Sequence, residues 1–166
     1  MKRILIGVTA LLMLLGSSQA VWGQNFSKNF LEQVPKSIVS TVTVNSSMIE
    51  LLKKRETNKD LLTFLSELSF LQIITVTSPF LSANDYCNKA MEQVKNYAQG
   101  EELLRIKDRQ QRTLLVAFDK MDGNKAGEII FINCDGDTLT IVNIKGTISI
   151  GNLGKLSSLS NSIKKL

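Results

Sequence analysis

The sequence predicts an α+β domain: a mainly antiparallel sheet of about six strands, with helices packed on it and a closing C-terminal helix. Segments with helical spacing of apolar residues and segments with strand-like alternation both occur along the chain. Residues 113–146 (TLLVAFDKMDGNKAGEIIFINCDGDTLTIVNIKG) are apolar β-forming runs interrupted twice by Asp-Gly turns. We therefore expect this stretch to form the middle of the sheet.

The N-terminal residues have the layout of a secretory signal peptide. Lys2 and Arg3 form a short positive region, an almost wholly apolar stretch follows, and small or polar residues come next. Cleavage is expected after Ala20 or after Gly23, and no cysteine lies near either position to carry a lipid anchor. The expectation is an exported, soluble protein, periplasmic or secreted, that is not a lipoprotein.

The chain divides into three parts on this basis. Residues 1–23 are the cleaved signal peptide, residues 24–36 are an N-terminal arm or short helix, and residues 37–166 are a single α+β domain. The whole chain carries 20 basic and 15 acidic side chains, and loss of Lys2 and Arg3 leaves 18 against 15, or +3. So small an excess argues against nucleic acid as a partner. No second apolar run long enough to cross a membrane follows in the mature chain.

The first elements of the domain are predicted from apolar spacing and from the residues at their boundaries. They are a strand at 37–44, a helix capped by Asn45 or Ser46, a second helix beginning at Thr57 or Asn58, a buried strand at 70–77, and a long helix from a capping box at 82–85 to a stop at Gly100.

Strands dominate the rest of the chain. The expected elements are strands at 102–107, 113–119, 128–134 and 137–145, with a tight hairpin at 134–137, and a last helix along Leu153, Leu156, Leu159 and Ile163.

Two basic groups are candidate binding surfaces. Lys53, Lys54 and Arg55 are either an anion site or cations favourably placed at a helix C-terminus, and we favour the second. Arg105 and Lys107 share one face of a predicted strand. This face either docks an acidic partner or a glycan, or keeps an exposed strand soluble and discourages edge pairing, which we favour.

Cys87 and Cys134 also leave two possibilities open. In an exported protein they can form a disulfide that stabilises the fold by closing a long loop. Otherwise they are two buried thiols that behave as small apolar residues. Without a C-x-x-C motif, we do not expect a redox enzyme.

The sequence lacks the residues and motifs that several kinds of catalysis and metal binding require. The chain has no histidine, which removes Ser-His-Asp and Cys-His catalysis and the common zinc sites. No G-x-S-x-G, P-loop or G-x-G-x-x-G motif occurs. Asp119, Asp122, Asn124 and Glu128 loosely suggest a calcium loop, but their spacing fails the EF-hand template and favours a polar hairpin loop. We expect no metal or cofactor and assign no catalytic residue.

Three segments resemble a known family. LSELSFLQIITV, ELLRIKD and EIIFINCDGDTLTIVNIKGTISIGNLGKL, within residues 39–163, are similar to domain-of-unknown-function (DUF) family 4252. The resemblance implies an exported α+β domain in the cell envelope of Gram-negative bacteria, with no established reaction, substrate or active residues. This sequence departs from the family pattern in Cys87, Cys134 and a longer loop at 121–127.

The leading functional hypothesis is a non-enzymatic envelope module that binds a partner protein or a ligand. One alternative is a hydrolase that uses Asp, Glu or Ser without His, which a cluster of acids in a deep pocket would support. Another is a small-ligand carrier, which needs a sizeable apolar cavity. A flat surface with an exposed strand edge would favour the binding module. The sequence leaves the partner, the ligand and the oligomeric state open.

Overall fold

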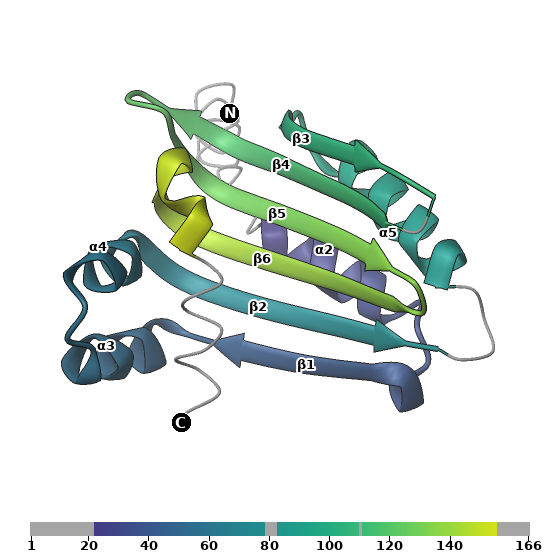
Figure 1. The fold of residues 1–166 in the computed structure, drawn as a ribbon, viewed down its shortest axis with the longest axis horizontal. Coiled ribbons are helices and arrows are strands. Elements are labelled where there is room, and N and C mark those ends of the chain that lie inside the picture. Colours follow the sequence, from purple (N-terminus) through teal and green to yellow (C-terminus); the bar gives the residue numbers. More distant parts are fainter. Residues whose placement is uncertain (1–21, 79–82, 110, 156–166) are drawn as a thin grey trace, which may run out of the picture.

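The protein is an antiparallel sheet with helices on both faces (Figure 1). The structure, a computed structural model, describes residues 22–78, 83–109 and 111–155. In this part of the chain six strands pair in the order β1-β2-β6-β5-β4-β3, every neighbouring pair antiparallel. The predicted α+β class and strand number are confirmed.

The strands are β1 (Val39–Val44), β2 (Leu68–Thr77), β3 (Glu101–Lys107), β4 (Gln111–Met121), β5 (Lys125–Asp135) and β6 (Thr138–Ser149). The described helices are α2 (Trp22–Leu31), α3 (Ser46–Arg55), α4 (Lys59–Glu67) and α5 (Ala83–Tyr97), with two 3-10 segments, η1 (Lys36–Ile38) and η2 (Ile150–Lys155).

Local sequence chemistry sets several of these boundaries. The side chain of Asn45 accepts a hydrogen bond from the Met48 N–H at 3.0 Å and caps α3. Asn58 caps α4 in the same way. The β5–β6 hairpin turns at Gly136, whose φ of +54° suits glycine. Of the two caps predicted for the first of these helices, the structure therefore uses Asn45.

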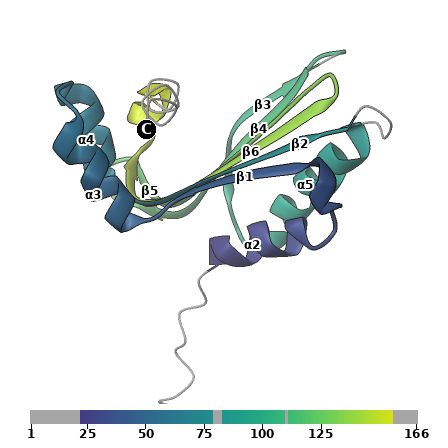
Figure 2. The ribbon, with the colours of Figure 1, turned by 90° about the horizontal axis from the view of Figure 1, so that it is seen from below.

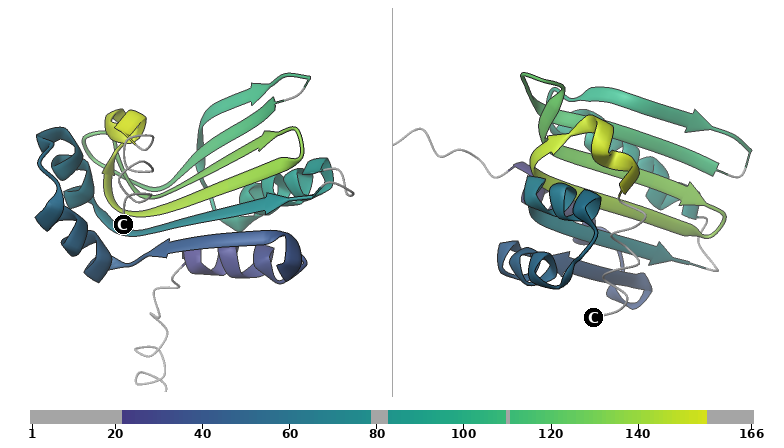
Figure 3. Two further views of the ribbon diagram at one scale, coloured as in Figure 1. Left: turned by 60° about the horizontal axis from the view of Figure 1, so that its bottom comes forward. Right: turned by 60° about the vertical axis from the view of Figure 1, so that its left-hand side comes forward.

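Helices cover the two faces of the sheet unequally. Figure 2 shows α2 and α5 on one face, and α3, α4 and η2 on the other face, gathered at one end of the strands. The sheet curves toward α3, α4 and η2, so that face is concave (Figure 3). The remaining length of the concave face has no described helix on it.

Successive side chains of the central strands point to opposite faces of the sheet and so form two separate hydrophobic cores. In β5, Ile130 and Ile132 point toward α2 and α5, whereas Ile129 points toward α3 and α4. All three are fully buried. A strand buried on both faces has a nearly continuous apolar sequence, which explains the runs that marked the centre of the sheet.

The first part of the predicted arm at 24–36 belongs to helix α2, which packs in the first core. Phe26, Phe30 and Val34 are buried among residues of α5 and the sheet. The rings of Phe26 and Tyr97 meet edge-on, with 5.8 Å between their centroids. The described part of helix α2 runs from Trp22 to Leu31.

A close approach between α4 and β6 requires glycine. Gly146 has φ +153°, and a Cβ atom there would lie 1.9 Å from the carbonyl oxygen of Glu67. The Glu67 side chain also accepts hydrogen bonds from Ser149 and Asn152. These contacts fix α4 and η2 against the end of β6.

Part of the prediction lies outside the described residues. This applies to the signal peptide up to residue 21, to Ser82 of the capping box, and to Leu156, Leu159 and Ile163 of the last helix. Within the described part, residues 150–155 form η2, with Leu153 half-buried against the second core. Among the described residues, no helix is both long and apolar enough to span a membrane.

Candidate binding surfaces

An apolar row crosses the concave face of the sheet. Directly paired residues of neighbouring strands share a face, and one set of pairs is apolar across all six strands. From β3 to β1 this open row consists of Leu104, Leu115, Phe131, Val142, Ile73 and Val42. Leu104 and Val42 are each 41% exposed, and the four residues between them are half-buried.

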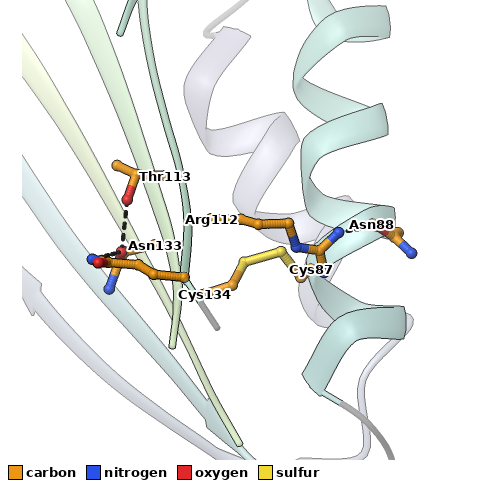
Figure 4. The surroundings of a disulfide bond; sticks show 7 residues. Cys87, Asn88, Arg112, Thr113, Asn133 and Cys134 are labelled. Atoms are coloured by element: carbon orange, nitrogen blue, oxygen red, sulfur yellow. Dashed lines mark hydrogen bonds between the residues drawn. A yellow bond between two sulfur atoms is a disulfide. The ribbon is translucent and has the colours of Figure 1, made fainter. Parts of the chain in front are cut away.

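The open row borders the second core on one side and a polar row on the other. Ile73, Leu115 and Val142 pack against the residues buried under α3 and α4. The next row of pairs is Ile106, Thr113, Asn133, Thr140, Thr75 and Ser40. The Thr113 hydroxyl donates to Asn133 Oδ1 at 2.9 Å, on the side of the sheet away from α5 (Figure 4). Neither row contains a charged side chain.

The two edges of the sheet differ in chemistry. At one edge, β1 pairs with β2 in regular register, and its residues 40–43 are exposed and uncharged. At the other edge, β3 has a register shift after Glu102 and carries four charged residues. Charges and bulges are the usual protection of an edge strand against pairing, so β3 is protected and β1 is not.

A hollow of about 440 Å³ lies beside β1 on the α2 face. Its lining is mostly apolar and includes Leu31 of α2, Phe70 of β2 and Thr43 of β1. Lys28, Lys36 and Glu32 belong to the same lining. The Gln72 amide donates to the Thr43 hydroxyl at 3.3 Å, which holds both side chains on this face.

The basic residues singled out in the sequence lie on β3 beside α5. Arg105 Nε donates to Glu102 Oε1 at 2.6 Å, so its charge is paired within the strand. Lys107 and Arg105 line a second hollow with Arg112, Lys95 and Glu92. This geometry is that of a charged edge strand, and the docking of an acidic partner or glycan there stays a prediction.

The first basic run lies where helix α3 ends. Lys53, Lys54 and Arg55 occupy its last turn, near the carbonyl end of the helix dipole. Lys53 Nζ also pairs with Glu50 at 2.6 Å. The position of the run matches the helix dipole, and Lys53 is also paired within the helix.

From the sequence, Glu128 is expected both at the start of the strand 128–134 and as the last residue of the suggested calcium loop. It lies within β5, 3% exposed, on the α2 and α5 face. Burial raises the pKa of its carboxyl, while the charge of Lys145 and a hydrogen bond with Asn143 act in the opposite direction. Oε1 of Glu128 accepts no hydrogen bond from the described residues. Burial also raises the pKa of the Tyr97 phenol, with the charges of Glu128 and Asp119 adding to it.

The other residues of the suggested calcium loop are divided between a strand and a turn. Asp119 lies in β4, whereas Asp122 and Asn124 lie in the β4–β5 turn. Among the residues that the structure describes, no three His, Cys, Asp or Glu side chains gather as they would around a metal ion.

Cys87 and Cys134 are joined in the structure. The disulfide links the start of α5 to the end of β5, with 6.2 Å between the Cα atoms (Figure 4). Beside it, Arg112 Nη1 of β4 donates to Asn88 Oδ1 of α5 at 2.6 Å. Both cysteines are buried in the first core, so the bond fixes the helix to the sheet from inside.

The protein is a single α+β domain with helices on both faces of its sheet, and part of the concave face beside α3 and α4 has no described helix on it. The sequence model of the family described as "Domain of unknown function (DUF4252)" matches residues 35–156, and the chain belongs to this family. No curated protein matches the chain. No solved structure matches it either.

Sequence reasoning did not find the open row, the hollow or the unprotected β1 edge. The predicted strand at 37–44 implies, by simple alternation, that Val42 lies on a different face from Thr41 and Thr43, and the register of β1 agrees. The order of the strands, which makes β1 an edge and aligns the row, is not visible in local spacing.

We expect removal of the disulfide to destabilise the protein. The bond joins residues 47 apart, and a loop of this size accounts for about 2–4 kcal/mol of stability. The double variant Cys87→Ala/Cys134→Ala should unfold at lower urea than the oxidised protein, and close to the protein in dithiothreitol. Equal unfolding midpoints for the variant and the oxidised protein would contradict this expectation.

The stability of the protein should depend on the protonation of Glu128. Because its pKa is raised in the folded state, the folded protein binds this proton more tightly than the unfolded chain does. Stability is therefore greatest below the unfolded-state pKa and falls as the pH rises through the window between the two pKa values. Glu128→Gln should remove this fall, as measured by urea unfolding from about pH 4 across the neutral range. The exposed Glu92→Gln is the control, and a fall of the same size in Glu128→Gln would refute the assignment.

Proposed function

We propose that the protein is a non-enzymatic binding module of the cell envelope, and that it binds a partner protein on the open face of its sheet. The observation that carries this proposal is the open row, six apolar residues paired across all six strands without a described helix above them. Contiguous apolar surface of this kind marks interaction sites in folded proteins.

The partner we propose is an amphipathic helix. The row crosses five inter-strand spacings of about 4.8 Å, or roughly 24 Å. A helix of about 16 residues has that length at 1.5 Å per residue. Since the open row and the polar row beside it contain no charge, the helix would meet them with one apolar stripe flanked by Ser, Thr, Asn or Gln.

Export is part of the proposal. The pattern of the N-terminal residues supports it, and so does the Cys87–Cys134 disulfide, because such bonds persist in oxidising compartments. The intact mass of the protein recovered from the envelope fraction should correspond to a chain that starts at Val21 or Gln24. A mass that includes Met1 would exclude cleavage.

The binding surface can be tested by photocrosslinking in the native envelope fraction. A p-benzoylphenylalanine placed at Phe131, at the centre of the row, should crosslink to a partner segment with apolar residues at helical spacing. Leu104→Glu, which puts a charge at one end of the row, should lower the yield about fivefold or more. The same photoreactive residue at Leu51, a leucine of α3 that is 50% exposed but outside the row, is the control.

The charge reversals Arg105→Glu and Lys107→Glu separate this surface from the basic face of β3. These variants should leave the crosslink at Phe131 unchanged. If they abolish the crosslink, the partner binds at β3 and not on the open row. Crosslinks confined to residues 156–166 of the same chain, or equal yields from Phe131 and Leu51, would count against a partner on the open face.

A further inference from the structure

The edge of the sheet at β1 is open to another strand. Residues 40–43 are exposed, carry no charge, and pair with β2 without a bulge, so the other side of β1 presents its backbone groups in a regular ladder. The opposite edge shows how this same chain protects a strand. In β3, Glu101 forms an ion pair with Lys120 at 2.7 Å, and Glu102 forms one with Arg105. The register of β3 against β4 also shifts between Glu102 and Leu104.

The hollow beside β1 lies where a side chain of an added strand would point. A residue opposite Thr43 on a new strand shares the face of Thr43, which is the α2 face. Thr43 itself lines the hollow, together with Leu31 and Phe70. Its volume of about 440 Å³ has room for a bulky side chain, and the mostly apolar lining favours an aliphatic or aromatic one.

We propose that β1 receives an extended segment of a partner protein as a seventh strand, with a bulky apolar side chain opposite Thr43 seated in the hollow under α2. Main-chain hydrogen bonds to β1 supply the attachment, and the hollow supplies the sequence preference. The neighbouring residue, opposite Val42, lies on the concave face and extends the open row by one position.

The proposal predicts the sequence of the bound segment. It is a run of β-forming residues without charge next to β1, with Leu, Ile or Phe opposite Thr43 and an apolar residue opposite Val42. A second copy of β1 does not fit this pattern, because Val39–Val44 has no bulkier residue than valine to place in the hollow. The inference rests on β1 and the hollow, and it stands whether or not the open row binds a helix.

The test uses the purified protein and a phage-displayed library of random twelve-residue peptides. Selected peptides should share alternating β-forming residues with one invariant bulky apolar position, and synthetic copies should slow deuterium exchange in the segment 39–44. Replacing the invariant residue by Ala should weaken binding about tenfold or more.

Two matched edge variants locate the site. Thr41→Lys puts a charge on the exposed edge of β1 and should weaken peptide binding about tenfold, as lysine does on natural edge strands. Ile106→Lys makes the same change on β3, where the residue is 43% exposed, and should leave binding within about twofold. Leu104→Glu, which disrupts the open row, should leave it unchanged as well.

Three results would overturn the inference. The first is a failure to select any peptide, and the second is exchange protection on β3 or the central strands in place of β1. The third is a dimer in light scattering that Thr41→Lys dissociates, which would assign the β1 edge to a second copy of the chain.

Discussion

The structure depends on a sheet whose central strands are buried on both faces. Alternate residues of β5 and β6 enter two different cores, one under α2 and α5 and one under α3 and α4. A sheet of this kind needs helices on each side. On the concave side the described helices cover only one end of the strands, and the apolar positions continue past them. The open row is therefore the uncovered margin of the second core.

Much of the fold follows from local sequence. The alternation at 37–44 and the apolar run at 70–77 gave β1 and β2, and Asn45 and Asn58 mark the helix starts because their side chains replace missing backbone partners. The strand order does not follow, because pairing between β2 and β6 joins segments about 70 residues apart and leaves no local mark. The need for glycine at position 146 cannot be predicted from local sequence either, because it arises from the close approach of the Glu67 carbonyl oxygen of α4.

The candidate surfaces depend on this long-range order. Val42 and Leu104 are ordinary strand residues until the pairing places them at opposite ends of one row. The hollow beside Thr43 exists only because α2 packs across the sheet. Glu128 is expected in a strand from the sequence, and it lies in β5, but its burial follows from the helices on that face of the sheet and not from its own position in the sequence. Whether a strand residue of this protein is buried or exposed therefore depends on which helix covers its face of the sheet.

The strand order also has a consequence for how the chain folds. Strands β3 to β6 are consecutive neighbours that pair through short connections, but β2 pairs with β6, the last strand among the described residues. During synthesis the Leu- and Ile-rich β2 can pair with β1 early, but it gains its central partner β6 only after residue 149 has emerged. Non-local pairing of this kind slows folding and prolongs the exposure of a strand prone to aggregation. The N-terminal pair of strands is thus the last part of the described sheet to be joined to the rest.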